Sequence, residues 1–465
     1  MALHSRRWTC DAVGPRSGPY NRFPMHDTLT ECKECGLLQR NPPLPPGGSS
    51  VCARCGCALH RDRPDSLNRT LALTIAGLLL FIIANSFPFL SFSMQGQMTQ
   101  TTLFTGILDL YDQGKWEIAA VVAFTSVLAP GLQLSLLLIV LVPLTGDRLP
   151  GWLPTLFRHV RTLTPWGMMD VFMLGILVAV VKLSDMATIV PGVSLFAFAA
   201  LIFVLAAAQA ALDPDLVWSR VPVRGAVARP LEPGEAYIGC DVCELVVPQR
   251  AALFDGRRER CPRCTDVLHH RKPRSMQRTW ALVLAAVILY IPANLLPIMT
   301  VTSLGRTQSD TILSGVVFLL THGMWPLAAV VFLASIFVPL LKLLILIFLL
   351  VSVQLRSSWR PRERTLLYRI IETIGRWSMV DIFVVTILVA LVRLGNLASI
   401  EAESGAIFFC AVVVITMIAA MSFDPRLIWD NLERTGVQGR GSDHVGDRER
   451  GRPTAGAARG RTRPA

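Results

Sequence analysis

The chain has 465 residues, of which 52% are hydrophobic, and its mean hydropathy is +0.48. This composition excludes an intrinsically disordered protein and is unusually apolar for a soluble one. The net charge of +12 comes largely from loops, linkers and tails. The chain shows no Walker motif, glycine-rich nucleotide loop, Ser/His/Asp arrangement or haem signature, so an enzyme is not predicted.

Residues 1–66 are polar and rich in proline and cysteine, and no apolar core of a signal peptide occurs before Leu71. We predict a disordered extension over 1–30 and a small metal-binding module over 31–66. A linker and a second module are predicted over 221–275, and a disordered, arginine-rich tail over 431–465. The cations of the tail suit contact with anionic lipid, and no nucleic-acid partner is expected.

Each module contains two Cys-x2-Cys knuckles, separated by 16 or 17 residues, which is the spacing of a zinc ribbon. A knuckle turns the chain so that both thiolates reach one ion at about 2.3 Å, and two knuckles complete a tetrahedron. Four cysteines leave no open coordination position, so the sequence predicts two structural Zn²⁺ ions. The predicted ligands are Cys32, Cys35, Cys52 and Cys55 in the first module and Cys240, Cys243, Cys261 and Cys264 in the second.

The other cysteines, Cys10, Cys57 and Cys410, are interpreted as free thiols, the last as a packing residue in an apolar stretch. Cys57 follows a knuckle closely and could compete for the ion. His60 and His269 follow the knuckles too, but four thiolates already complete each site. The alternative function for paired thiols is disulfide exchange, although the surrounding segment lacks the βαβ pattern of such proteins.

Eight apolar stretches are close to or above the roughly 18 to 20 residues that cross a bilayer as a helix. They form two groups of four, one over 67–220 and one over 276–430, each behind a metal-binding module. The predicted fold is an all-α, multi-pass membrane protein with two tandem four-helix units, each preceded by a zinc ribbon. The stretches are 70–92, 117–143, 167–187, 193–212, 279–301, 325–352, 378–398 and 405–423.

The two groups are copies of one pattern, and this internal repeat decides the architecture before any single motif does. Each first helix opens on Arg-Thr and ends on Asn-x2-Pro, and Trp-x3-Asp and Asp-Pro bracket the later helices. In a membrane protein such a repeat also predicts a shared pathway between the halves. The matched positions are Arg69 with Arg278, Asn85 with Asn294, Gly114 with Gly323, Pro130 with Pro339, Trp166 with Trp377, and Asp213 with Asp424.

Arginine in short loops predicts the orientation, because cytoplasmic loops carry the excess of Lys and Arg. The loop between the second and third helices contains Arg148, Arg158 and Arg161 in the first half and six arginines in the second. The longest loops on the other side offer only Lys115 and Arg306. We therefore predict that both modules and both termini are cytoplasmic.

Ionisable groups within an apolar span are costly and are candidate functional residues. Lys182 and Asp185 lie three residues apart in the third stretch, so they share one helix face and can pair. The second half has Arg393 and Asn396 at these positions. The alternative interpretation is that Lys182 snorkels to the outer surface.

Other polar residues in the stretches have simpler interpretations. Asp170 and Asp381 begin their helices, where the helix dipole favours a carboxylate. Lys342 lies near the cytoplasmic end of its stretch, matches Gln133 of the first half, and is interpreted as a snorkelling cation. Most hydroxyls in spans bond to a neighbouring turn. Three become candidates only if they converge with the polar pair of the third stretch: Ser335, Ser378 and Thr416.

The repeated combination of paired cysteine knuckles, Arg-Thr, Asn-x2-Pro, Trp-x3-Asp and Asp-Pro over about residues 30–430 resembles the paraquat-inducible protein A (PqiA/LetA) family. The resemblance implies a bacterial inner-membrane protein with cytoplasmic zinc ribbons. It also implies a periplasmic MCE-domain partner that carries phospholipid between membranes, and a polar cluster in the membrane units that takes part in transport. The closest matches to that cluster are Lys182 and Asp185, followed by Ser335, Ser378 and Thr416.

The predicted function is that of a transport component, in which lipid passes between the membrane and the partner through a pocket between the halves. Lys182 would attract a phosphate headgroup, or the pair Lys182–Asp185 would gate by protonation. Two alternatives stay open at this point. One is a stand-alone proton-coupled transporter of small molecules, and the other is a membrane-bound thiol redox protein or sensor.

Overall fold

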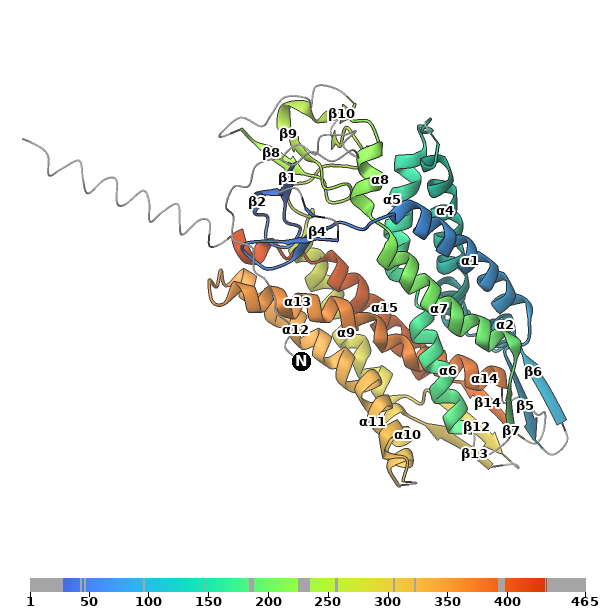
Figure 1. Ribbon diagram of the computed structural model, residues 1–465. Coiled ribbons are helices and arrows are strands. Elements are labelled where there is room, and N and C mark those ends of the chain that lie inside the picture. The colour runs from blue at the N-terminus through green and yellow to red at the C-terminus, as the bar shows by residue number, and fades with distance from the viewer. Residues whose placement is uncertain are drawn as a thin grey trace, which may run out of the picture.

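The computed structural model describes residues 28–41, 44–45, 47–94, 97–146, 148–183, 188–224, 235–255, 258–303, 306–321, 323–391, 398–430 and 432. The described chain is a helical body with two small β-modules at one end and two short sheets at the other (Figure 1). The disorder predicted for 1–30 and 431–465 falls almost wholly outside the described residues.

Each metal-binding module contains two antiparallel hairpins. Three of the four knuckles lie between the two strands of a hairpin, whereas the knuckle Cys261–Cys264 follows the last strand of the second module. In the first module the knuckles end in left-handed turns at Gly36 and Gly56, with φ of +71° and +72°, which glycine adopts without strain. The first module contains β1 (Thr28–Glu31), β2 (Leu38–Asn41), β3 (Ser49–Val51) and β4 (Ala58–Arg61). The second contains β8 (Tyr237–Gly239), β9 (Val246–Pro248), β10 (Leu253–Asp255) and β11 (Arg258–Arg260).

Within the described residues, eight helical segments are long and apolar enough to cross a membrane, four in each half. They overlap the eight predicted stretches, so the predicted fold of two tandem four-helix units is confirmed. The second and third spans of each half are built from two consecutive helices. The first half contains α1 (Ser66–Ser86), α3 (Trp116–Ala123), α4 (Ala129–Leu144), α5 (Leu153–Leu163), α6 (Met169–Leu183) and α7 (Val193–Ala211). The second contains α9 (Ser275–Leu295), α11 (Trp325–Phe332), α12 (Val338–Gln354), α13 (Pro361–Ile374), α14 (Val380–Leu391) and α15 (Ser404–Ser422).

The second span of each half widens into a π-helical turn just before a proline. The turn η1 (Phe124–Leu128) joins α3 to α4 ahead of Pro130, and η4 (Leu333–Phe337) joins α11 to α12 ahead of Pro339. Proline removes one backbone donor and crowds the preceding turn. These two positions are therefore where the spans depart from regular α-helical geometry. Such π turns are frequent at functional sites.

Two three-stranded antiparallel sheets, which the all-α prediction did not include, lie at the end opposite the modules (Figure 1). Each combines a hairpin after the first span with a strand before the fourth, in the orders β6-β5-β7 and β13-β12-β14. A short helix follows each hairpin, α2 (Leu103–Asp112) or α10 (Ile312–Thr321). The strands are β5 (Leu90–Met94), β6 (Gln97–Thr101), β7 (Thr188–Pro191), β12 (Met299–Ser303), β13 (Arg306–Asp310) and β14 (Ala398–Ala402).

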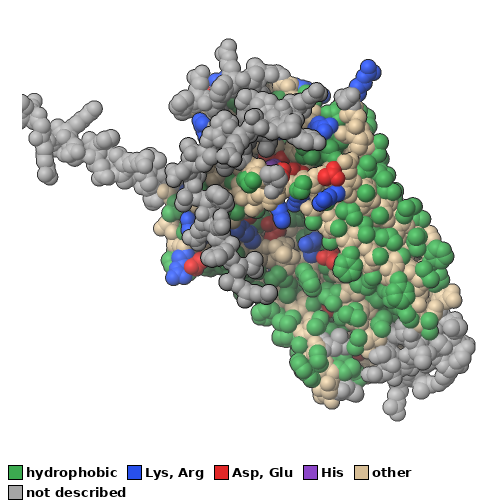
Figure 2. Space-filling model, in the orientation of Figure 1, with side chains coloured by type: hydrophobic (Ala, Val, Ile, Leu, Met, Phe, Trp, Pro, Cys, Tyr) green, Lys and Arg blue, Asp and Glu red, His purple; other side chains and the backbone are tan. Residues whose placement is uncertain are grey.

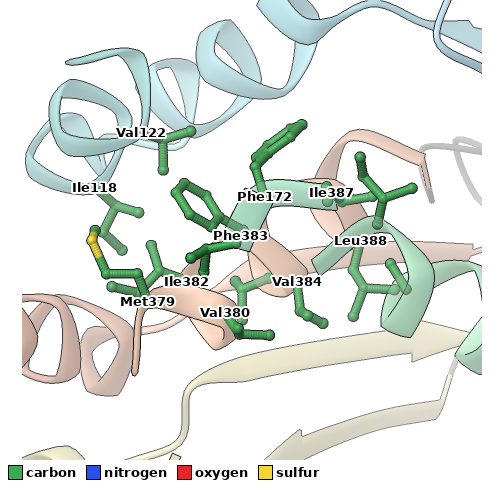
Figure 3. Close-up of a cluster of buried hydrophobic side chains, with 14 of the residues drawn as sticks. Ile118, Val122, Phe172, Met379, Val380, Ile382, Phe383, Val384, Ile387 and Leu388 are labelled. Carbon is green, nitrogen blue, oxygen red and sulfur yellow. The ribbon is translucent and has the colours of Figure 1, made fainter. Parts of the chain in front are cut away.

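The two halves meet where α6 packs along α14. A Cβ placed on Gly175 of α6 would lie 2.9 Å from the Cβ of Phe383, so this approach requires glycine. Phe172 of α6 meets Phe383 edge to face, with ring centroids 5.2 Å apart, among the apolar side chains drawn in Figure 3. Every residue of α14 is buried. This helix is therefore the centre of the body.

Charged side chains are distributed unevenly over the surface. Figure 2 shows Lys, Arg, Asp and Glu near the metal-binding modules, whereas the helix surfaces farther away are mostly hydrophobic. An apolar exterior is what transmembrane helices present to lipid. Together with the eight spans, this surface makes the chain a multi-pass membrane protein.

Candidate functional site

The eight predicted metal ligands form two compact groups of cysteine sulfurs, which we name the first and second cysteine tetrads. Within each tetrad, all four sulfurs lie within 4.8 Å of one another. In the first, Sγ of Cys32 lies 3.5 Å from Sγ of Cys55, and Sγ of Cys35 lies 3.5 Å from Sγ of Cys52. In the second, the equivalent separations are 3.4 and 3.5 Å.

Both tetrads fit an ion with four thiolate ligands. A tetrahedral site with metal–sulfur bonds of about 2.3 Å separates the sulfurs by about 3.8 Å, close to the spacing found. Seven of the eight cysteines are buried and Cys55 is partly buried, so each site is shielded from solvent. The residues present can hold one metal ion in each module.

Each module packs on the membrane unit of the other half. The first tetrad lies in one apolar cluster with residues of α12, α13 and the end of α15. The second tetrad lies in another cluster with residues of α4, α5 and the short helix α8 (Pro214–Arg220). Few residues separate a module from the unit behind it, so the sequence indicates close docking but not this exchange. The crossed docking braces the two halves against each other.

Two arginines at equivalent positions of the repeat anchor the crossed docking. Arg158 of α5 donates a hydrogen bond from Nη1 to Asp266 of the second module at 3.2 Å. Arg369 of α13 donates from Nε to Glu34 of the first module at 2.6 Å. The same helix position therefore holds the opposite module in both halves.

A third arginine joins both modules to the end of the second half. Arg426, which is 3% exposed, lies 3.1 Å from Asp424, 3.1 Å from Asp241 of the second module and 3.6 Å from Glu31 of the first. Burial alone would lower the pKa of Arg426, but the surrounding carboxylates, led by Asp241, outweigh burial and raise it. The junction therefore keeps a cation that holds three acidic groups together.

His60 and Cys57 lie outside the first tetrad. Nδ1 of His60 instead forms a hydrogen bond with Oδ2 of Asp215 in α8, and this bond raises the pKa of His60. Asp213 accepts a hydrogen bond from the backbone N–H of Asp215 at 3.0 Å and so caps α8. The thiol of Cys57 donates to the carbonyl of Ala58 at 3.3 Å. The first module is thus also tied to its own half, through His60.

Inside the second membrane unit, Lys342 is the centre of a polar cluster. Its Nζ donates hydrogen bonds to Oγ1 of Thr416 at 2.9 Å, to Oγ of Ser378 at 3.3 Å and to the carbonyl of Gly375 at 3.3 Å. The residue is 1% exposed. The snorkelling predicted for Lys342 is therefore wrong, because its stem carries the ammonium between α12 and α15 and not to the surface. We name Lys342, Ser378 and Thr416 the lysine cluster.

The first half has a neutral residue at the equivalent of Lys342. Gln133 takes that place and is buried, with its Oε1 3.1 Å from where a Cβ on Gly167 would lie. Gly167 is the counterpart of Ser378, and Leu205 is the counterpart of Thr416. Both halves therefore place a polar side chain at this point of the second span, but only the second half places a cation and two hydroxyls there.

The other predicted transport residues have no described contact with the lysine cluster. Ser335 lies in η4 and donates to the carbonyl of Val331 at 2.6 Å, as hydroxyls in spans commonly do. Lys182 belongs to α6, but its side chain lies outside the described residues, as does Asp185. The structure thus brings Ser378 and Thr416 together around Lys342, for which the sequence predicts a surface position.

The two helix-start aspartates differ in environment. Both lie in the first turn of their helix, as the sequence predicts. Asp170 is exposed, whereas Asp381 is only 9% exposed and lies in a helix whose residues are all buried. The same motif position therefore faces the exterior in one copy and the interior in the other.

Comparison with known families gives two matches within the chain, one for each membrane unit. The family model described as Paraquat-inducible protein A matches residues 67–222 and 276–433. The chain belongs to the paraquat-inducible protein A family. The resemblance seen in the repeated motifs is thereby confirmed.

Curated relatives cover most of the chain. It is 34% identical over 407 residues to Intermembrane transport protein PqiA of Escherichia coli (strain K12), covering 86% of this chain and 95% of the relative. It is 32% identical over 429 residues to Lipophilic envelope-spanning tunnel protein A of the same strain, covering 92% and 95%. It is 28% identical over 420 residues to Probable intermembrane transport protein of Haemophilus influenzae, covering 87% and 96%. No solved structure matches the chain.

Proposed function

We propose that this chain is an inner-membrane component of an MCE-type system that moves phospholipid between membranes. The observation that carries the transport role is the lysine cluster, in which a cation is buried within a membrane span. Ionisable groups at such positions line substrate, ion and proton pathways. Two relatives are named as intermembrane transport proteins and one as an envelope-spanning tunnel protein, and these names support the same role.

Lys342 is the residue that we assign to coupling within this pathway. Its three described partners are neutral oxygens, and a buried ammonium held only by such groups is costly. A lipid phosphate that reaches the cluster would supply a counter-charge, and a proton that leaves Nζ would remove the need for one. Lys182, Asp185 and Ser335 remain proposed members of the same pathway.

We assign Zn²⁺ to both cysteine tetrads as a structural ion. Each module is too small to form a sufficient apolar core, so the metal would supply much of its folding energy. Four thiolates fill the coordination sphere and leave no position for a substrate, which supports a structural ion and argues against catalysis at the metal. The arginine-rich loops support an orientation with both modules in the cytoplasm.

The proposed partner is a periplasmic MCE-domain protein that receives lipid from, or delivers lipid to, the membrane units. The test is mass spectrometry of the proteins and lipids that co-purify with the tagged chain in mild detergent. We expect an MCE-domain protein and phospholipid enriched over a control membrane protein of similar size. Recovery of the chain alone, without excess lipid, would overturn the proposal and favour a stand-alone transporter.

A matched pair of variants ties the test to the proposed site. Lys342→Met should abolish lipid transfer in reconstituted vesicles, whereas Gln133→Met changes the equivalent position of the first half and should retain it. The alternative hypothesis, a membrane-bound thiol redox protein, predicts a different result. In that case mild oxidant would release metal from the tetrads and change activity, whereas the structural ions proposed here persist.

A further inference from the structure

Two equivalent glycines lie in opposite surroundings. Gly106 of α2 packs tightly on α14, where a Cβ on it would lie 3.1 Å from the Cβ of Ala390 and 3.4 Å from Cγ2 of Thr386. Gly315 is its counterpart in α10, and a Cβ on Gly315 would meet nothing within 4 Å. At this position the first half therefore packs its short helix against the core, whereas the second half leaves open space.

The open space beside Gly315 is a pocket that reaches the centre of the body. It encloses about 70 Å³, and about 580 Å³ when its open side is included. Its walls come from α10, α11, α14, the start of β12, the end of β13 and Val178 of α6, so residues of both halves line it. The stretch of α14 along it, from Asp381 to Leu388, is about 10 Å long at 1.5 Å per residue.

The residues that line the pocket indicate what kind of ligand it can bind. Most of the wall is apolar, with Ile298, Leu319, Val331 and Val384 among its residues. The charged groups among its described lining residues are the carboxylates of Asp310 and Asp381, and carboxylates repel a phosphate. An apolar pocket of this kind does not hold water well. Its natural occupant is thus a hydrocarbon chain, which gains free energy for every methylene buried.

The pocket also lies beside a helix surface that faces the hydrocarbon interior of the membrane. Leu313, Val317 and Leu320 on the outer side of α10 are exposed, at 57%, 50% and 53%. In a chain with eight membrane spans, such a surface contacts lipid. A bilayer lipid can therefore reach the pocket from the side, past a helix that is not packed against the core at Gly315.

We propose that the pocket between α10 and α14 binds one acyl chain of a membrane lipid, entered laterally beside Gly315. This inference rests on the proposed lipid-transport function and adds the place where the lipid's apolar part is held. The equivalent helix of the first half, α2, packs against α14 at Gly106 and leaves no comparable space beside that glycine. The headgroup stays outside the carboxylate-lined walls.

The test uses a phosphatidylcholine whose acyl chain carries a diazirine, with the full chain reconstituted in nanodiscs. After photolysis, mass spectrometry maps the labelled peptides. Bulk lipid does not reach α14, because all its residues are buried. Label on residues 381–388 therefore reports the pocket, and we expect it there. Absence of label on this stretch, while exposed helices such as α9 are labelled, would overturn the proposal.

A variant that fills the pocket sharpens the result. Gly315→Leu should lower the label on α14 by about tenfold, the effect of displacing roughly two buried methylenes. Val317→Phe adds similar bulk on the lipid side of the same helix and should leave the label unchanged. Equal labelling of α14 in a folded Gly315→Leu protein would overturn the proposal. If Gly315→Leu does not fold, Gly315→Ala and Gly315→Val give a graded series.

The outcomes separate this inference from the proposed function. Partner recovery and lipid transfer without label on α14 would refute the acyl-chain pocket alone. Label on α14 that Gly315→Leu abolishes, in a protein that neither transfers lipid nor recovers a partner, would establish the pocket and refute the transport role.

Discussion

The Nζ of Lys342 donates a hydrogen bond to Oγ1 of Thr416 across 2.9 Å, and this bond joins the second span of the second half to the fourth. A further bond, to Ser378, reaches the segment that opens the third span. One ammonium therefore contacts three of the four spans. Any movement that separates these spans must break a bond to a buried cation, so the position of the helices and the state of Lys342 are coupled.

Replacing this cation should separate its structural role from its transport role. Lys342→Met keeps the stem and removes the buried charge, so we expect unchanged or higher thermal stability, by up to about 1–4 kcal/mol. Lipid transfer should fall by at least about tenfold, since an intramembrane cation of this kind is a functional group. Gln133→Met is the control and should retain transfer. Normal transfer by Lys342→Met would remove Lys342 from the pathway.

Removing one partner should have the opposite effect on stability. Thr416→Val leaves Nζ of Lys342 with one hydrogen bond fewer in a buried site, at an expected cost of about 1–3 kcal/mol in unfolding free energy. In the Lys342→Met background the same change should cost under about 1 kcal/mol, and this difference is the coupling energy of a double-mutant cycle. Thr386→Val is the control, since Thr386 bonds the carbonyl of Ile382 in its own helix. Additive costs would show that the bond contributes little.

The cysteine tetrads predict metal content and a crossed pattern of destabilisation. We expect two zinc ions per chain by elemental analysis and one in Cys243→Ser. Loss of the second ion should speed hydrogen exchange in α5, because the second module docks on the first half. Cys35→Ser should instead affect α13, because the first module docks there.

The control for both variants is Cys57→Ser, which should keep two ions because the Cys57 thiol bonds a carbonyl outside the tetrad. The crossed docking would be contradicted if each cysteine variant sped hydrogen exchange only in the membrane unit that directly follows the altered module in sequence.

The architecture was predictable because its determinants are local and repeated. Cysteine spacing defines the knuckles, and span length defines the helices, independently of how they pack. The strands were missed although residues 90–94, Leu-Ser-Phe-Ser-Met, alternate in polarity, which is the period of a half-buried strand. The crossed docking depends on tertiary contacts such as that of Arg369 with Glu34, 335 residues apart in sequence.

The position of Lys342 was mispredicted for a physical reason. The position of Lys342 in its stretch indicates its depth in the membrane but not which face of the helix it occupies, and snorkelling and burial require opposite faces. A signal was present, because the first half also has a polar residue, Gln133, at this position. A polar side chain retained in both copies of an apolar helix indicates an interior site more than a surface one.

The bond between His60 and Asp215 predicts that the stability of the chain depends on pH. The counterparts in the second half, His269 and Arg426, cannot form such a bond. Because this bond raises the pKa of His60 above its ordinary 6.5, its stabilisation is complete below about pH 6.5 and is lost as pH rises through the raised pKa. Asp215 is 36% exposed, so screening limits the contribution to about 0.5–1 kcal/mol. Thermal unfolding of His60→Gln and the intact chain should therefore differ at pH 6 and converge at pH 9.

The second half supplies the control for this effect. His269 is the counterpart of His60 and is exposed, and the counterpart of Asp215 is Arg426, which no histidine cation would approach. His269→Gln should therefore leave the thermal midpoint unchanged at both pH values. Asp215→Asn should reproduce the behaviour of His60→Gln, because either change removes the same charged pair. A difference between His60→Gln and the intact chain that persists at pH 9 would mean that His60 stabilises the module by packing and not by its charge.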